Sequence, residues 1–250
     1  AGTNGVSADD IDLVSTGGNV NLTDGTVAAV DAVVIDANGN ITQATGETLT
    51  GTNIGLEAGG NIGTPNAGTD NNAIAFNATN LALTAGGSAN ARDTAGGVTL
   101  VNSVTAVQET VTGTSTGTSL ELEANGTNAN LTISDDVVVG TGADLVADGN
   151  VVLSNSVTAT NDIVISADND LDGSGAITQT AGTITADGLG LRASGNIDNG
   201  AGGAISTSIN TLAVDSDPTA SGTGGDIHLQ DNTGDFVLNA VTGVDETVGV

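Results

Sequence analysis

The sequence predicts an all-β solenoid of about eleven coils of roughly 20–25 residues each. A short phrase recurs along the whole chain: two aliphatic residues spaced two apart, then a small residue, then glycine or another turn former. Aromatic residues make up only 1% of the chain although 38% of it is hydrophobic, which argues against both an ordinary globule and a disordered chain. A repeat of this length with one strand signal per unit is typical of a solenoid.

Each predicted coil begins with apolar and polar residues that alternate with a period of two, the pattern of a strand. The clearest examples run over residues 54–62 and 189–197. The expected starts are Ile11, Val33, Ile54, Leu81, Val98, Leu120, Ala143, Ile163, Leu189, Leu212 and Ile227. The spacing varies, so we place the extra residues in corner loops, the longest of them over residues 63–72. If every coil places its strand in the same position, Leu56, Leu83, Leu122, Ile165 and Leu191 should stack in one interior column.

A larger repeat overlies the first. Val33, Ile54, Leu81 and Val98 have counterparts at Ile163, Leu189, Leu212 and Ile227, which lie 130, 135, 131 and 129 residues later. We therefore predict one continuous solenoid over residues 1–250, made of tandem modules at approximately 11–142 and 143–250. The chain begins Ala1-Gly2-Thr3 without methionine or a signal peptide, so we interpret it as a processed product or a segment of a longer protein.

The charge of the chain excludes several partners. The formal net charge is −28, and Arg92 and Arg192 are its only strong cations. A nucleic-acid surface needs a basic footprint, and an anionic membrane surface attracts basic segments, so neither partner is expected. The chain has no cysteine, and no apolar run approaches the ~18 residues of a membrane-spanning helix. We expect neither disulfides nor membrane insertion.

Two phrases carry a resemblance to a known family. Residues 175–186 (GAITQTAGTITA) and 189–197 (LGLRASGNI) resemble the repeats of filamentous-haemagglutinin-like exoproteins, the large adhesins that Gram-negative bacteria export by two-partner secretion. The resemblance covers most of the chain and rests on the style of the repeats. It implies a right-handed parallel β-helix, an extracellular or bacterial cell-surface location, and adhesive or structural work.

One motif has the chemistry of a cation site. Asp168, Asp170 and Asp172 stand at alternate positions of a loop, and Gly173 follows them. Carboxylates at positions 1, 3 and 5 with glycine at 6 match the start of a calcium loop. Position 12 would be Gln179 instead of the usual glutamate, so an acidic corner loop without metal is the alternative. These three aspartates are the candidate metal ligands, and calcium is the only cofactor considered.

Catalytic machinery is not expected. Glu121 and Glu123 share the outward face of one strand about 7 Å apart, which suits a glycosidase poorly without a cleft. His228 lies between Ile227 and Leu229 and should face solvent as an isolated imidazole. β-Helix enzymes that act on acidic polysaccharides need clustered cations, and this chain has two arginines. We therefore predict no catalytic residues and no enzyme.

The sequence favours a non-catalytic structural or adhesive shaft of an extracellular bacterial surface fibre or large secreted adhesin. One alternative is the subunit of a self-assembling extracellular filament, and another is a carbohydrate-binding or carbohydrate-active β-helix protein. The expected partners are the chain itself or adjoining repeats, stacked end to end, and host-cell or matrix glycans held by loops. Within the stack, Asp36 should lie over Glu57, while Arg192 should lie beside Asp215 and offset its charge.

Overall fold

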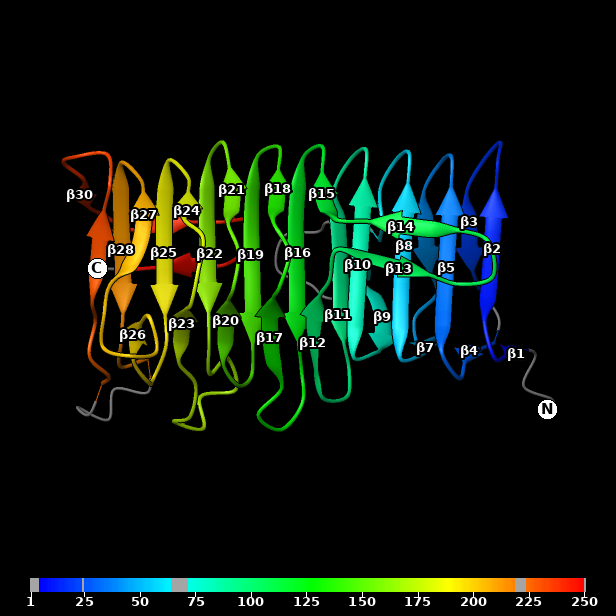
Figure 1. The fold of residues 1–250 in the computed structure, drawn as a ribbon, viewed down its shortest axis with the longest axis horizontal. Helices are drawn as coiled ribbons and strands as arrows, with labels where there is room; N and C mark the ends of the chain where they lie inside the picture. The colour runs from blue at the N-terminus through cyan, green and yellow to red at the C-terminus, as the bar shows by residue number, and fades with distance from the viewer. Residues whose placement is uncertain (1–4, 24, 64–71, 219–223, 250) are drawn as a thin grey trace.

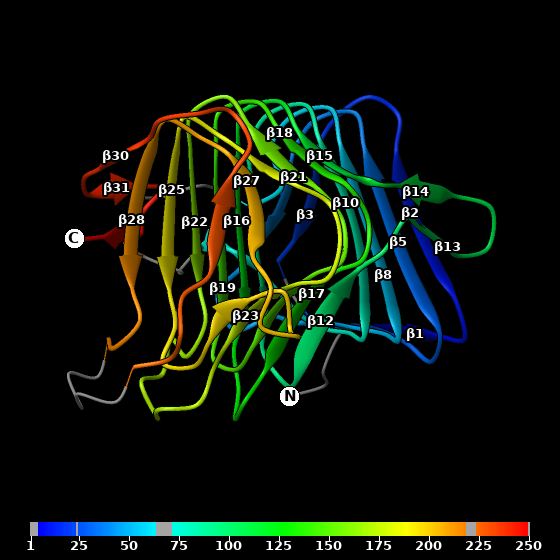
Figure 2. The same ribbon diagram turned by 60° about the vertical axis from the view of Figure 1, so that its left-hand side comes forward.

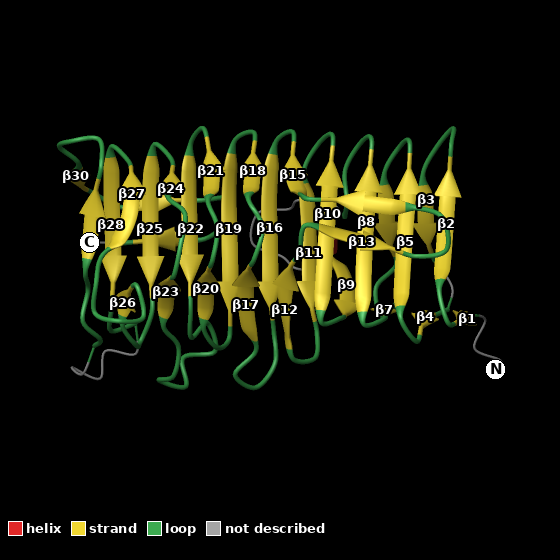
Figure 3. Ribbon diagram, in the orientation of Figure 1, coloured by secondary structure: helices red, strands yellow, loops and turns green. Residues whose placement is uncertain are grey.

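The computed structural model is an all-β rod of about ten turns of parallel solenoid (Figures 1 and 3). It describes residues 5–23, 25–63, 72–218 and 224–249. No α-helix occurs in these ranges, and hence none with the length and apolarity that a membrane crossing requires. Most of the loop expected at residues 63–72 lies outside the described residues.

The N-terminal part of the rod has one row of long strands and two rows of short ones. The long row is β2 (Ile11–Ser15), β5 (Ala32–Ala37), β8 (Asn53–Ala58) and β10 (Asn80–Ala85). One short row is β1 (Val6–Ala8), β4 (Val27–Ala29), β7 (Leu49–Thr50) and β9 (Ile74–Asn77), and the other contains β3 (Val20–Leu22) and β6 (Ile41–Gln43). All pairs within these rows are parallel.

The C-terminal part has the same plan with the faces exchanged. Its long row is β11 (Ala89–Asp93), β16 (Ser119–Ala124), β19 (Gly142–Ala147), β22 (Asp162–Ser166), β25 (Gly188–Arg192) and β28 (Thr211–Asp215). One short row is β12 (Gly97–Leu100), β17 (Asn130–Ile133), β20 (Val151–Leu153), β23 (Ile177–Gln179) and β26 (Ile197–Asp198). The other is β15 (Thr114–Thr116), β18 (Val137–Val139), β21 (Val157–Ala159), β24 (Ile184–Thr185), β27 (Ile205–Ser208) and β29 (Leu229–Asp231).

The two parts join where one long strand is followed by two short ones. The first half of β10 pairs with β12, while its second half pairs with β15. Between β12 and β15 the chain leaves the solenoid as a hairpin of β13 (Ser103–Thr105) and β14 (Thr110–Thr112). A second hairpin, β31 (Val241–Thr242) and β32 (Thr247–Val248), follows β30 (Val237–Leu238), which pairs with the first half of β28. The two hairpins lie on opposite sides of the rod (Figure 2).

This exchange of faces corrects the predicted interior column. Leu56 stacks on Leu83 as expected, but the partner of Leu83 in the next turn is Thr114. Leu122, Ile165 and Leu191 belong to a separate column on the opposite long row. The start at Val98 lies on the same face as the starts before it, in the strand whose Leu100 is the partner of Leu81, but Leu120 lies on the opposite face and Ile227 returns to the first. The intervals from Val98 to Leu120 and from Leu212 to Ile227 are therefore each about half a turn, which is why about ten turns form instead of eleven. The module division near residue 142 stays a prediction.

A single apolar core fills the rod. Its buried side chains run without interruption from Ile11 to Leu212, and Ala, Val, Ile and Leu supply nearly all of them. Phe76 is the one aromatic residue in this core. Stacked turns place like side chains over like, so a thin core closes without large aromatic residues.

Asparagine side chains connect consecutive turns at one corner. The backbone N–H of Asn40 donates to the Oδ1 of Asn19, and the N–H of Asn61 donates to the Oδ1 of Asn40, at 2.8 and 2.7 Å. The N–H of Ser88 continues this ladder by donating to Asn61 at 2.9 Å. These bonds satisfy corner N–H groups that no strand pairs, which explains the abundance of asparagine after strands.

Candidate functional site

The predicted cation loop lies between β22 and β23. One carboxylate oxygen from each of Asp168, Asp170 and Asp172 falls within 4.8 Å of the others. Asp168 is buried and has a φ of 60°, and its carboxylate accepts the N–H of Gly173 at 3.2 Å and the hydroxyl of Ser194. The structure therefore brings all three sequence-predicted carboxylates together.

The electrostatics of this loop favour a cation. Desolvation raises the pKa of Asp170, whereas a hydrogen bond from the backbone N–H of Asp172 lowers it. The neighbouring carboxylates of Asp172, Asp148 and Asp168 also raise this pKa. Hydrogen bonds from Ser174 lower the pKa of Asp172. A divalent cation relieves the repulsion among such oxygens, which are the ligands that calcium prefers. Gln179 is buried and is hydrogen-bonded to Ser206, so it supplies no twelfth-position ligand.

The hairpin β13–β14 is a second feature of the surface. It lies across the outer faces of β10, β8 and β5 (Figure 1) and buries Val104 and Val111 against Val34 and Ala82. A Cβ at Gly55 would lie 3.1 Å from the nearest Val111 methyl, so a small residue is needed beneath the hairpin. At the tip of the hairpin, the N–H groups of Gln108 and Glu109 donate to the Oδ2 of Asp12 in β2, at 2.7 and 3.3 Å.

The hairpin β31–β32 docks in the same manner. Val241 and Val248 are buried against Val164 and Ala213, and the nearest Val248 methyl would lie 3.0 Å from a Cβ at Gly190. The N–H groups of residues 244, 245 and 246 donate to the Asp144 carboxylate in β19 at 2.9, 2.7 and 2.9 Å.

Each hairpin docks on a row of four residues from four adjacent strands, its docking row, and the two docking rows contain the same residue types in the same order. Strand register places Asp12, Val34, Gly55 and Ala82 side by side on four successive strands, and it places Asp144, Val164, Gly190 and Ala213 in the same order. The hairpin sequences VTAVQETV (104–111) and VTGVDETV (241–248) also correspond. This paired signal was available in the sequence, but both segments alternate with a period of two, as solenoid strands also do.

Asp144 has the most strongly perturbed carboxyl group of the two docking rows. Burial raises its pKa to about 7, and a hydrogen bond to the Asp245 side chain raises it as well, while the three backbone donors act in the opposite direction. Its side chain is fully buried beneath the hairpin. Loss of hydration on burial outweighs the three backbone donors, so the net shift of the Asp144 pKa is upward.

The residues considered for catalysis form no catalytic arrangement. Glu121 and Glu123 share one face of β16 as expected, but Glu121 is buried, contrary to the expected exposure, and accepts the Asn90 amide at 2.7 Å. Glu123 accepts the Asn125 amide at 3.1 Å. His228 is exposed as expected, with its Nδ1 2.9 Å from the Gly202 carbonyl oxygen.

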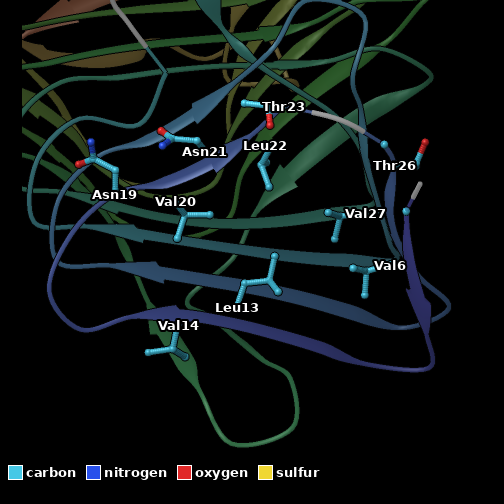
Figure 4. A pocket seen from close by; sticks show the side chains of 12 residues that line it. Val6, Leu13, Val14, Asn19, Val20, Asn21, Leu22, Thr23, Thr26 and Val27 are labelled. Carbon is cyan, nitrogen blue, oxygen red and sulfur yellow. The ribbon is translucent and has the colours of Figure 1, made fainter. Parts of the chain in front are cut away.

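A hollow opens at the N-terminal end of the rod. It has a volume of about 600 Å³, and its lining includes the apolar side chains of Val6, Leu13, Val20, Leu22 and Val27 (Figure 4). Val6, Leu13, Val20 and Leu22 belong to the first turn and Val27 to the start of the second, and the hollow continues the axis of the apolar core. None of the described residues that line it is titratable.

Comparison of the chain with known protein families, with curated proteins and with solved structures finds no match in any of the three.

Proposed function

We propose that this chain is a non-catalytic structural shaft of an extracellular bacterial surface fibre or adhesin. The observation that carries the proposal is the uninterrupted apolar core, which runs through the parallel ladders from Ile11 to Leu212. Each turn contacts mainly its neighbours, so the architecture provides length and stiffness. The resemblance of residues 175–197 to exported adhesin repeats supports the extracellular location and the adhesive role.

Single-molecule pulling from the two ends tests the mechanical part of this proposal. A shaft should lengthen in steps as successive turns unravel, and each turn of roughly 20–25 residues should release about 70–90 Å of chain. One abrupt low-force opening of the whole chain would contradict a load-bearing role. Antibody labelling of intact producing cells tests the location, and labelling only after permeabilisation would refute it.

A self-assembling filament subunit is the second candidate. The observation that favours it is the apolar hollow lined by Leu13, Val20 and Val27, which further solenoid strands would fill. Sedimentation velocity over a wide concentration range tests the candidate. End-to-end assembly predicts species that grow in whole multiples of the monomer, whereas a monomer at every concentration would remove it.

Calcium bound by Asp168, Asp170 and Asp172 is part of the shaft proposal. The convergence of their oxygens within 4.8 Å supports it. A bound ion would fix the loop that connects β22 to β23 and would reduce repulsion in a chain of net charge −28.

A further inference from the structure

The two docked hairpins face side chains of opposite charge. Glu109 and Glu246 occupy the same place in the two hairpin sequences, two residues before the second buried valine. Beneath them, register places Glu57 two residues after Gly55 in β8 and Arg192 two residues after Gly190 in β25. The corresponding hairpin glutamate therefore faces a carboxylate in one docking row and a guanidinium in the other.

The second hairpin is held by an ion pair. A guanidinium nitrogen of Arg192 lies 2.8 Å from a carboxylate oxygen of Glu246. The strand neighbours of Arg192 are Ser166, which is neutral, and Asp215. Together with the three N–H donors to Asp144, this pair attaches the tip of the hairpin to β19 and β25.

The first hairpin rests on like charges. Burial raises the pKa of Glu57, and the carboxylates of Asp36 and Glu109 raise it as well. Asp36 is the strand neighbour of Glu57, as the sequence predicted, and Thr84 is the neighbour on the other side. The tip makes two N–H contacts with Asp12, one of them 3.3 Å long, and the second oxygen of Asp12 is buried without a hydrogen-bond partner.

No cation offsets this repulsion within the elements that pack together. The titratable groups that face the first hairpin are Asp12 on β2, Asp36 on β5 and Glu57 on β8, and Asp135 lies near its base. Strands β2, β5, β8, β10, β13 and β14 contain no lysine, arginine or histidine. The side chains around Glu109 of the first hairpin therefore carry only negative charge, whereas Glu246 of the second hairpin pairs with Arg192.

We propose that β13–β14 is a charge-gated strap, whose open fraction rises at low ionic strength and falls when salt screens its carboxylates, whereas β31–β32 is a strap that an ion pair keeps closed. Opening of the first strap uncovers the apolar strip of Val34 and Ala82 together with the inner valines of the hairpin, Val104 and Val111. The outer face of β5, β8 and β10 would then change from polar to apolar without unfolding of the core. This inference does not depend on the chain being a shaft.

Amide hydrogen exchange in 10 mM and 300 mM sodium chloride, at one fixed pH, tests the proposal on the whole chain. Because exposed like charges typically cost about 0.2–1 kcal/mol, salt should raise the protection of the Gln108 and Glu109 amides by a factor of about 1.4 to 5. The Asp245 and Glu246 amides should show no gain or a loss, because salt screens their ion pair. A salt response of the same sign and size at both hairpins would overturn the proposal.

Substitutions at the equivalent positions separate charge from packing. Glu57→Arg should raise protection of the first strap at low salt, and Arg192→Glu should lower that of the second. Glu57→Gln removes the repulsion without creating an ion pair, so it should raise protection and reduce the salt dependence even if Glu57→Arg does not fold. Glu47→Gln makes the same change in net charge on another part of the surface and should leave both straps unchanged. Equal behaviour of Glu57→Gln and Glu47→Gln would refute the charge gate.

Discussion

Glycines stack at one corner of the solenoid without room for a side chain. A Cβ at Gly86 would lie 2.2 Å from the carbonyl oxygen of Gly59 in the turn before, and a Cβ at Gly117 would lie 2.0 Å from that of Gly86. The contact atoms belong to the backbone, so a substitution must separate two turns instead of moving one side chain.

Gly86→Ala should therefore lower the free energy of unfolding by about 1–3 kcal/mol, the usual cost of overpacking. Urea denaturation followed by circular dichroism measures this change. Gly17→Ala is the matched control, because a Cβ there has nothing within 4 Å, and it should change stability by less than about 0.5 kcal/mol. Equal stabilities of the two variants would contradict the close stacking of turns.

At the scale of elements, the second hairpin should respond to pH through Asp144. The folded-state pKa of Asp144 is raised from 3.8 to about 7, so between these values the folded chain binds a proton that the unfolded chain does not. The free energy of unfolding should therefore fall as the pH rises from about 4 to about 7, by up to about 4 kcal/mol, and then level off.

Chemical denaturation at closely spaced pH values measures this slope. Asp144→Asn cannot titrate, so it should lose the Asp144 contribution to the slope, while Asp12→Asn in the equivalent place under the first hairpin should retain it. A slope that Asp144→Asn leaves unchanged would show that other carboxylates account for the pH dependence.

The rows of strands could be predicted from sequence where one coil follows another without insertion. The alternation in β5, β8 and β10, and again in β19, β22 and β25, gave correct registers, including Asp36 beside Glu57. The change of face at β10 could not be predicted, because the hairpin divides what would be one strand into β12 and β15. A valine-rich hairpin has the same alternation as a solenoid strand, so periodicity alone does not distinguish them.

The candidate sites differed in how far sequence revealed them. The acidic loop was predictable because Asp168, Asp170 and Asp172 are close in the chain, and a tight loop brings their oxygens together. The docking of the hairpins was not predictable from spacing alone, because Asp12 and Glu109 are 97 residues apart. Their contact depends on how many turns the hairpin crosses.

At the scale of the whole molecule, stacked turns determine the shape in solution. About ten turns at roughly 4.8 Å per turn give a rod about 50 Å long. Small-angle X-ray scattering should therefore show the distance distribution of an elongated particle. A symmetric distribution, as a sphere of the same mass gives, would contradict the extended stack.

The net charge of −28 should make the stability of the whole rod depend on cations. Self-repulsion weakens a compact state when few cations balance it, so moderate sodium chloride should raise the melting temperature. Calcium should raise it further than sodium at equal ionic strength, because Asp168, Asp170 and Asp172 can bind the ion directly.

Thermal melts in chelator, in sodium chloride and in calcium chloride at matched ionic strength separate these two effects. The double variant Asp170→Asn and Asp172→Asn should keep the sodium response and lose the additional calcium response, since both side chains are exposed and their replacement leaves the core intact. The double variant Asp9→Asn and Asp235→Asn removes the same charge far from the loop in sequence and should keep both responses. An additional calcium response that survives removal of the loop carboxylates would place the bound ion elsewhere, whereas identical melts in all three solutions would show that neither screening nor binding stabilises the rod.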